Sequence, residues 1–375
     1  MRLLDRYLLR ELLLPFAYCL GGFLIVWISS DLFNRIGEFQ EAHLSVLDIA
    51  QYYLVKAPEL LAIVLPVALL LALLYALTQH ARNNEITAMR AAGVSLWRLA
   101  LPYLGVGFLA SIGLFLMNEL WATDADERAE MLVARRAGED QAKFNRHIVQ
   151  NLGFVNSRDG RNWTIISLNT ETMEMKNPIV ISTQPDGSQL QFYASHAIHT
   201  NDMWVFFNVR EFHMASGSNA EPVPTRQEAV MARPDFTETP EEIRSEVAIS
   251  RQQSSLKRRH RTEISLTEIW NYLALHPNPT PGMKSLLDTK LHARIAGPWK
   301  CLVVVLIALP FGAASGRRNI FAGVAGSIVI CLAYFALLEI SLAAGTAGYV
   351  PGWLAGWFPN LVFTLTGIWL TARVR

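Results

Sequence analysis

The short polar segment Ala81–Ser95 holds the charged residues that are best spaced for a recognition role. Its stretch E-I-T-A-M-R-A-A consists of strong helix formers, and Gly93 follows it as a residue that commonly ends a helix. Glu85 would lie at the start of this helix and Arg90 nearer its end, which matches the helix dipole. The pattern fits both a solvated surface helix and a docking element for a partner protein.

The sequence gives little support for a catalytic site. No G-x-x-x-x-G-K-[ST] motif is present, and Gly312–Arg318 lacks both the lysine and a preceding strand, so any ATP-driven work needs another subunit. His196 and His199 would lie on opposite faces of a strand with no third ligand nearby, so we expect no metal site. The sequence also lacks G-x-S-x-G and H-E-x-x-H, which disfavours a hydrolase.

Isolated charges offer two further candidates. Glu339 lies inside an apolar run, where a helix–helix hydrogen bond or a place in a cavity wall is favoured over a proton relay. The basic run Lys257–Arg261 is interpreted as a solvated linker, with contact to anionic lipid as the second choice. Nucleic-acid binding is not expected, because the formal net charge is only +1.

Six apolar runs must position these residues, and each is close to the roughly 20 residues that a helix needs to cross a bilayer. The chain is 51% hydrophobic and only 17% charged. The runs lie near Leu12–Leu32, Leu54–Leu77, Leu99–Leu120, Ile295–Ala314, Ile320–Ala343 and Trp353–Ala372. The sequence therefore predicts an α-helical integral membrane protein with six spans in a 3+3 layout.

The orientation of the spans follows from the positive-inside rule. If the N-terminus is cytoplasmic, only Arg35 and Lys56 fall in the short outer loops. The inner segments carry ten arginines, at Arg2, Arg6, Arg10, Arg82, Arg90, Arg98, Arg317, Arg318, Arg373 and Arg375. We therefore expect both termini to be cytoplasmic and the polar segment 121–294 to lie outside, in the periplasm of a bacterium with two membranes.

The polar segment changes from a helical to a β pattern near Ile148. Short runs rich in Val, Ile, Phe, Trp and Thr are separated by turn signals such as Asp159-Gly160 and Asp186-Gly187. The predicted strands are Ile148–Asn156, Asn162–Asn169, Ile179–Thr183, Gln189–Ala194 and Trp204–Glu211. Ala215–Arg261 is expected to hold one or two weak strands and a linker. Ser265–Leu275 and Pro281–His292 are predicted to be helices that return the chain to the membrane.

Several of these motifs resemble one family, the lipopolysaccharide-export permeases of the LptF/LptG (YjgP/YjgQ) type. The resemblance covers the whole chain in order. It rests on Ala81–Ser95, on the opening Leu4–Glu11, and on Leu309–Gly312, Ser315–Arg318 and Trp357–Asn360. The opening Leu4-Asp5-Arg6-Tyr7 is similar to the LptG type, whereas the lack of a lysine cluster at Gln40-Glu41 is not, so both paralogues stay open.

The resemblance implies a non-enzymatic permease subunit of an ABC-type exporter in the bacterial inner membrane. A similar or identical permease would pair with it, and a cytoplasmic ATPase dimer would bind ATP-Mg, so no cofactor is expected in this chain. Glu85 would dock into a groove of the ATPase, with Asn84, Arg90 and Gly93 in the same loop and helix. Spans one and five would form lateral gates to a lipid cavity.

The resemblance also implies the division of labour along the chain. Residues 1–120 would hold spans one to three, with the coupling helix at about 82–93, and 295–375 would hold spans four to six. Residues 121–294 would form a periplasmic β-jellyroll-like domain that passes lipopolysaccharide, or a similar glycolipid, to a bridging jellyroll protein. Arg35 and Lys56 are the candidates for contact with lipid head-group phosphates, or else snorkelling anchors.

Three other functions fit the sequence less well. A lipoprotein-release or mechanotransmission permease typically carries its external domain after the first span, which the 3+3 layout disfavours. A membrane-anchored periplasmic enzyme lacks an acid/base constellation here. An ion-coupled transporter would more often show several intramembrane carboxylates and broken helices at mid-membrane.

Overall fold

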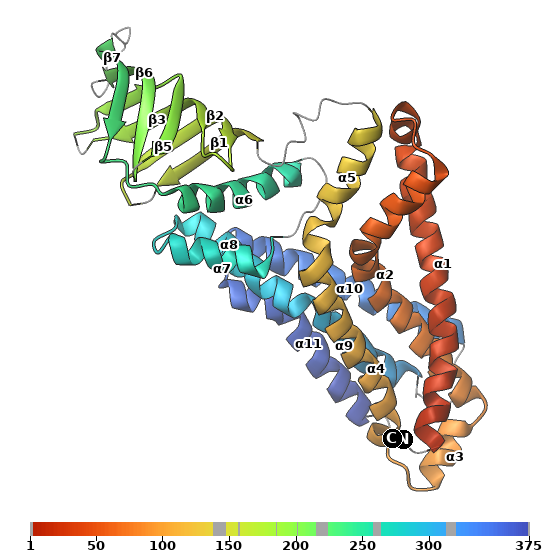
Figure 1. Ribbon diagram of the computed structural model, residues 1–375. Coiled ribbons are helices and arrows are strands. Elements are labelled where there is room, and N and C mark those ends of the chain that lie inside the picture. The colour runs from red at the N-terminus through yellow and green to blue at the C-terminus, as the bar shows by residue number, and fades with distance from the viewer. Residues whose placement is uncertain are drawn as a thin grey trace. The chain divides into compact units, whose positions relative to one another are not determined.

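The computed structural model describes residues 3–137, 148–156, 158–184, 186–200, 202–214, 224–257, 264–312 and 320–373. It divides into a helical unit, Met1–Val133 with Pro281–Arg375, and a sheet unit, Ala134–Thr280 (Figure 1). The sheet unit is shorter than the predicted segment 121–294. Residues up to Val133 group with the helical unit because Ala129 and Val133 join an apolar cluster of the first two long helices.

The helical unit contains most of the helices and two short helical turns. Their bounds are α1 Leu3–Glu41, α2 Val46–Arg82, α3 Glu85–Ala91, α4 Leu96–Met117, the π-helical turn η1 Asn118–Ala122, α5 Thr123–Ala137, α8 Pro281–Ala296, the 3₁₀ turn η2 Gly297–Trp299, α9 Lys300–Gly312, α10 Ile320–Thr346 and α11 Gly352–Arg373.

Within the described residues, five helices are long and apolar enough to span a membrane: Leu3–Glu41, Val46–Arg82, Leu96–Trp121, Pro281–Pro310 and Ile328–Thr346. The sixth predicted span, Trp353–Ala372, forms α11, a helix of 22 residues that is not among these five. Pro359 and Asn360 interrupt its apolar sequence. That α11 crosses the bilayer stays a prediction.

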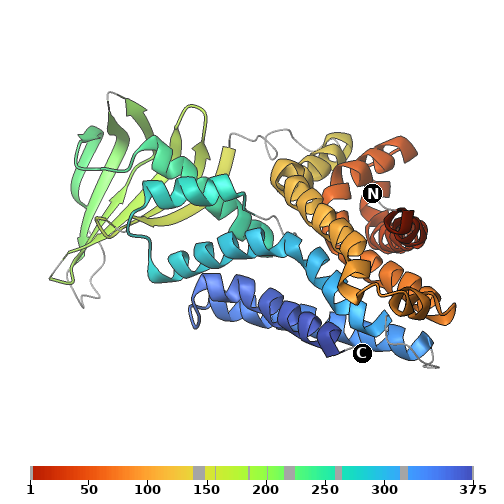
Figure 2. The same cartoon turned by 90° about the horizontal axis from the view of Figure 1, so that it is seen from below.

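Glycines let α11 pack closely on α8 and α9. Figure 2 shows these C-terminal helices from below, coloured cyan to dark blue. A Cβ atom at Gly356 of α11 would lie 2.8 Å from the backbone carbon of His292 in α8. A Cβ at Gly367 would lie 2.9 Å from the carbonyl oxygen of Leu306 in α9. These helices therefore approach at a distance that only glycine allows, as is common for helices in membranes.

The sheet unit contains seven antiparallel strands. They are β1 Ile148–Asn156, β2 Arg161–Asn169, β3 Met175–Thr183, β4 Gln189–Tyr193, β5 His196–Thr200, β6 Met203–Met214 and β7 Pro224–Arg233. β4 and β5 lie end to end and together occupy one strand position between β3 and β6. Both pair with β6, β4 at Arg210 and β5 at Phe207. The described strands thus form a meander with β1 and β7 at its edges, which differs from the crossed connections of a jelly roll.

Helices α6 Pro240–Lys257 and α7 Leu266–Leu275 complete this unit. Helix α6 lies along one face of the sheet (Figure 1). Its Ile243 and Val247 join the apolar core on that face, which includes the fully buried Trp163 and Trp204. The side-chain carboxylate of Glu238 accepts a hydrogen bond from Trp163 Nε1 at 2.9 Å, and its main-chain carbonyl accepts one from Trp204 Nε1 at 2.8 Å.

Candidate functional site

Helix α3 lies at the end of the helical unit where Figure 1 also marks both ends of the chain. Asn84 precedes it in the left-handed conformation (φ 58°), and Gly93, with φ +84°, follows it. Ile86 is buried and Met89 packs beside it on the main apolar cluster of the unit. The opposite face, made of Thr87, Ala88 and Ala91, is exposed. The predicted short helix and its glycine stop are thus present at the predicted residues.

The Glu85 carboxylate accepts hydrogen bonds from residues on the inner side of α3. The Tyr7 hydroxyl donates to Oε2 at 3.0 Å, and His80 Nδ1 lies 2.7 Å from the same oxygen. Asn83 Nδ2 donates to Oε1 at 3.2 Å. Burial acts to raise the pKa of Glu85, but these hydrogen bonds outweigh it and hold the pKa below its usual value. The carboxylate is therefore ionised at neutral pH.

The first turns of α1 contact the segments on both sides of α3. Asp5 Oδ1 lies 2.9 Å from Arg98 Nη2 at the start of α4, and the Tyr7 ring packs on the His80 ring with centroids 5.6 Å apart. Sequence reasoning missed Tyr7 and His80 as neighbours of Glu85. The available signal was the polar opening of this helix, which includes Asp5 and Tyr7 and belongs to the family-like motif.

Arg35 and Lys56, the two head-group candidates, converge on one aromatic ring. The Arg35 guanidinium carbon lies 5.7 Å from the centroid of Tyr52, and Lys56 Nζ lies 5.9 Å from it. Each cation also has an acidic neighbour: Arg35 lies 3.4 Å from Glu38, and Lys56 lies 3.6 Å from Glu59. Their charges are therefore partly compensated inside the helical unit.

The remaining candidates are dispersed. Glu339 is exposed on α10, on the same face as the exposed apolar residues Leu332 and Ile340. Arg90 is half-buried. The basic run Lys257–Arg261 lies outside the described residues except for the backbone of Lys257, the last residue of α6.

The two histidines of the sheet unit have different neighbours. His196 Nδ1 lies 3.3 Å from Glu174, and the His199 ring packs edge-on to Trp204. Among the described residues, no three His, Cys, Asp or Glu side chains gather as a metal site would require.

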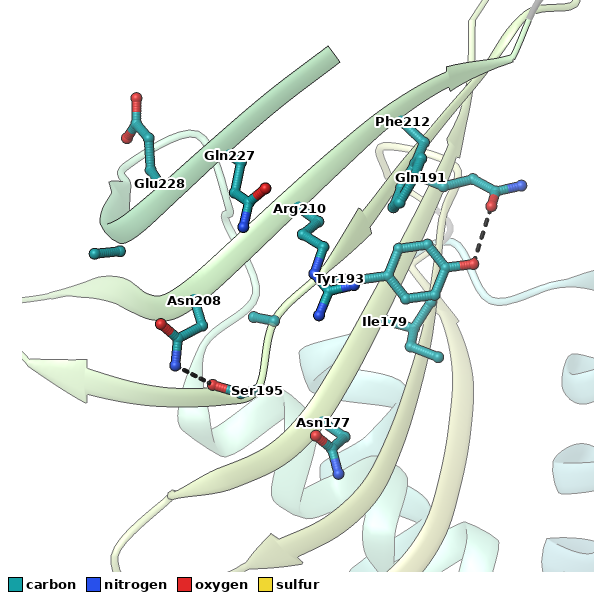
Figure 3. A pocket seen from close by; sticks show the side chains of 12 residues that line it. Asn177, Ile179, Gln191, Tyr193, Ser195, Asn208, Arg210, Phe212, Gln227 and Glu228 are labelled. Atoms are coloured by element: carbon teal, nitrogen blue, oxygen red, sulfur yellow. Dashed lines mark hydrogen bonds between the residues drawn. The ribbon is translucent and has the colours of Figure 1, made fainter. Parts of the chain in front are cut away.

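A groove of about 770 Å³ lies on the sheet face away from the core, between β3, β4, β6 and β7 (Figure 3). Amides, Arg210 and the rings of Tyr193 and Phe212 line it together, so its wall is amphiphilic. Tyr193 donates a hydrogen bond to Gln191 at 3.0 Å, and Asn208 Nδ2 donates one to Ser195 Oγ at 3.1 Å.

Three asparagines shape this sheet. Asn151, Asn177 and Asn208 have φ values of 55°, 48° and 51°, and the strand registers place them on one line across β1, β3 and β6. Left-handed residues interrupt a strand and bend it. Asn177 and Asn208 line the groove, so the bend and the groove coincide. Asn151 and Asn208 within predicted strands were the missed signal, whereas Asn177 was expected in a turn and lies inside β3.

Five apolar helices of membrane-spanning length, with an antiparallel sheet unit inserted in the sequence between the third and the fourth, are the architecture of a multi-pass membrane protein with an accessory domain. The comparison with protein families gives the same class. The chain belongs to the family of the lipopolysaccharide export system permeases LptF/LptG, which it matches over residues 6–373. It is thus a transport subunit of lipopolysaccharide export in the inner membrane, and not an enzyme. A search of curated proteins gave no match.

Proposed function

We propose that this permease is half of an ABC-type exporter, paired with a similar or identical permease above a cytoplasmic ATPase dimer. The family membership supports an ABC complex. Since the sequence has no P-loop, ATP-Mg would bind to the ATPase and its hydrolysis would occur there. The permease would extract lipopolysaccharide from the membrane and release it on the periplasmic side.

The exposure of α1 and α10 is the observation that carries this proposal. Only 6% of the apolar window of α1 and 17% of that of α10 are buried within the chain, against 61% for α2 and 67% for Pro281–Pro310. Two apolar helices that their own chain leaves uncovered are suited to face a second permease or lipid. They are the helices that the family resemblance assigns to the lateral gates.

The position of α3 supports the cytoplasmic orientation. α3 and both marked ends of the chain share one end of the helical unit (Figure 1), and Arg82, Arg90 and Arg98 lie in α3 or in the adjoining ends of α2 and α4. We infer that this end lies in the cytoplasm, that α11 is the sixth span, and that the sheet unit is periplasmic.

We further propose that the exposed face of α3 docks on the ATPase, with Asn84, Glu85, Arg90 and Gly93 maintaining the helix that presents it. Ala88→Glu would place a charge on this small-residue face. We expect the variant to insert in the membrane but to lose the ATPase during purification from native membranes.

Ala50→Glu is a matched control for this experiment, because Ala50 is exposed at the opposite end of α2. This control should retain the ATPase. Full ATPase recovery with Ala88→Glu would contradict docking through α3. Mass spectrometry of the purified complexes would identify the partner permease and the bound lipid in the same experiment.

We propose that the sheet unit relays lipid to a periplasmic bridging protein, the role that the family resemblance implies for the external domain. Its amphiphilic groove suits a molecule with acyl chains and a polar head. Strands β1 and β7 have unpaired edges among the described strands, and either could extend onto a strand of the bridge.

Arg35 and Lys56 remain our candidates for lipid phosphates. A phosphate would have to compete with Glu38 and Glu59 for them. We propose that Glu339, on the uncovered face of α10, lines the cavity or contacts the second permease.

A further inference from the structure

We propose that Tyr334 and Ser341 are positioning residues that hold α10 against its neighbours. They do so by serving two backbone carbonyls whose helical hydrogen bonds are missing. This inference rests on the proposed function, in which the uncovered side of α10 faces lipid or a second permease. It adds what keeps the other side of that helix in place.

The first carbonyl is that of Ala355 in α11. In an α-helix it would accept a hydrogen bond from the N–H of residue 359, but Pro359 has no N–H. Ser341 Oγ donates to this carbonyl at 2.8 Å instead. A Cβ atom at Gly345, one turn further along α10, would collide with the Ala355 side chain. The backbone of α10 therefore runs close enough for the short serine to reach.

The second carbonyl is that of Ala296, where α8 passes into the 3₁₀ turn η2. Its usual helical donor, the N–H of Lys300, bonds within the turn instead. The Asn360 side chain supplies the missing donor at 2.7 Å. Because Nδ2 of Asn360 points at this carbonyl, its Oδ1 accepts from another group, and the Tyr334 hydroxyl donates to it at 2.6 Å. Tyr334 therefore acts on the carbonyl through Asn360.

Both contacts lie on the covered side of α10. Tyr334, Ser341 and Gly345 follow one another at helical spacing on one face. Among the residues of α10 whose exposure the structure describes, only Tyr334 and Gly345 are buried. A polar group left without a partner there would cost free energy, whereas apolar contact between helices gains little over contact with lipid. The two polar contacts therefore decide where α10 lies.

The helices that receive these contacts are themselves fixed. Arg294, two residues before Ala296, lies 3.0 Å from Glu119 and donates to the Asn118 carbonyl at 2.7 Å, which ties α8 to the end of α4. Close packing at Gly356 ties α11 to α8. A displacement of α10 must therefore break the bonds of Tyr334 and Ser341.

The test uses the complete exporter in nanodiscs, with the three native cysteines replaced by alanine. The position of α10 is measured as the distance between spin labels at the exposed residues Leu332 of α10 and Leu365 of α11. Tyr334→Phe and Ser341→Ala should each raise the ratio of displaced to packed α10 by roughly three- to twentyfold, the scale of one side-chain hydrogen bond between membrane helices. Lipopolysaccharide released per ATP should fall in the same order, while the ATPase is retained.

Two hydroxyls that do not join helices provide matched controls. Tyr349→Phe changes a tyrosine that is 85% exposed in the turn after α10. Thr346→Ala removes a hydroxyl that donates to the Ala343 carbonyl within α10 itself. Both variants should keep the label distance and the lipid release of the unmodified protein.

Further variants separate positioning from a general structural role. Threonine and valine have nearly the same shape, so Ser341→Thr should keep α10 in its packed position, whereas Ser341→Val should displace it as Ser341→Ala does. The double variant Tyr334→Phe/Asn360→Leu should displace α10 no more than Asn360→Leu alone, because both changes interrupt one chain of bonds.

An unchanged label distance in both Tyr334→Phe and Ser341→Ala would overturn the inference. So would equal displacement by Ser341→Thr and Ser341→Val, which would assign the effect to shape. Failure of the underlying proposed function gives a different result: α10 is displaced in these variants, yet lipid release per ATP stays at the level of the unmodified protein. That result would remove α10 from the transport path and would overturn the role of its attachment in transport.

Discussion

Glu246 in α6 should make the stability of the sheet unit depend on pH. It is 6% exposed, accepts a hydrogen bond from the Tyr272 hydroxyl at 2.9 Å, and lies 3.3 Å from His276 Nε2. Burial raises the pKa of Glu246 to about 7, with a smaller opposing effect of the Tyr272 bond, and burial lowers the pKa of His276. The Glu246 carboxyl is thus protonated in mildly acidic solution, and burial disfavours the charged form of both side chains.

The sign follows from proton linkage. A carboxyl with a raised pKa in the folded protein stabilises it fully below the unfolded pKa, and this contribution is lost as pH rises through about 7. Moving a pKa from 4.5 to about 7 corresponds to roughly 3 kcal/mol. For a unit of this size, that free energy corresponds to roughly 6–12 °C in Tm.

Glu246→Gln should therefore melt at nearly the same temperature as the unmodified protein at pH 5 and several degrees higher at pH 8.5. Glutamine keeps the acceptor for Tyr272 and cannot ionise. The measurement is thermal unfolding in detergent, followed by the fluorescence of the buried Trp163 and Trp204. Glu241→Gln, exposed on the same helix, is the control. A Tm difference between Glu246→Gln and the unmodified protein that is the same at both pH values would refute the reasoning.

Two further predictions concern backbone geometry. Asn208→Val should destabilise the sheet unit by about 1–3 kcal/mol despite the strand preference of valine, because Asn208 has φ 51°. Asn208→Gly should cost less stability. Denaturant unfolding of both variants tests this prediction, and greater stability of Asn208→Val than of Asn208→Gly would contradict it. Gly356→Leu should separate α11 from α8 and lower the Tm of the helical unit in a detergent melting assay. Gly282→Leu should leave the Tm nearly unchanged in the same assay, because a Cβ at Gly282 would point into open space.

The elements with strong local signals could be predicted from the sequence. Helix α7 begins after Ser265, whose side chain accepts a hydrogen bond from the backbone N–H of Glu268, as the pattern of a capping residue indicates. β5 and β7 were not delimited, because neither has a long apolar run: β5 is five residues long, and β7 is mostly exposed. Their pairing with β6 forms them, and such pairing is not encoded locally.

The candidate site was predictable only in part, for a similar reason. Glu85 could be identified because the helix that it begins is recognisable from one short stretch of sequence. Tyr7 is 78 residues away, and no periodicity connects the two. Likewise, the charge count marked Arg35 and Lys56 but not Tyr52, the ring on which both converge. Contacts between distant helices become visible only in the folded chain.

Polar contacts at helix junctions give several of the family-like motifs a common physical role. Asn360, in the Trp-Phe-Pro-Asn motif, accepts a hydrogen bond from Tyr334 at 2.6 Å. It donates one at 2.7 Å to the carbonyl of Ala296, where α8 passes into the 3₁₀ turn. Arg294 lies 3.0 Å from Glu119 in the π-helical turn and donates to the Asn118 carbonyl at 2.7 Å.

Such contacts matter more in a membrane than in water. Lipid tails are as apolar as leucine, so helices in a bilayer gain little from burying apolar surface against one another. Packing of small residues and polar contacts must then fix where each helix lies. For α1, the most weakly covered of the candidate spans, the pairs Asp5–Arg98 and Tyr7–Glu85 are such contacts. The far end of α1 is held as well, because Phe39 is buried there and Tyr53 donates a hydrogen bond to Asp31 at 3.0 Å, so the uncovered stretch of α1 lies between two attached ends.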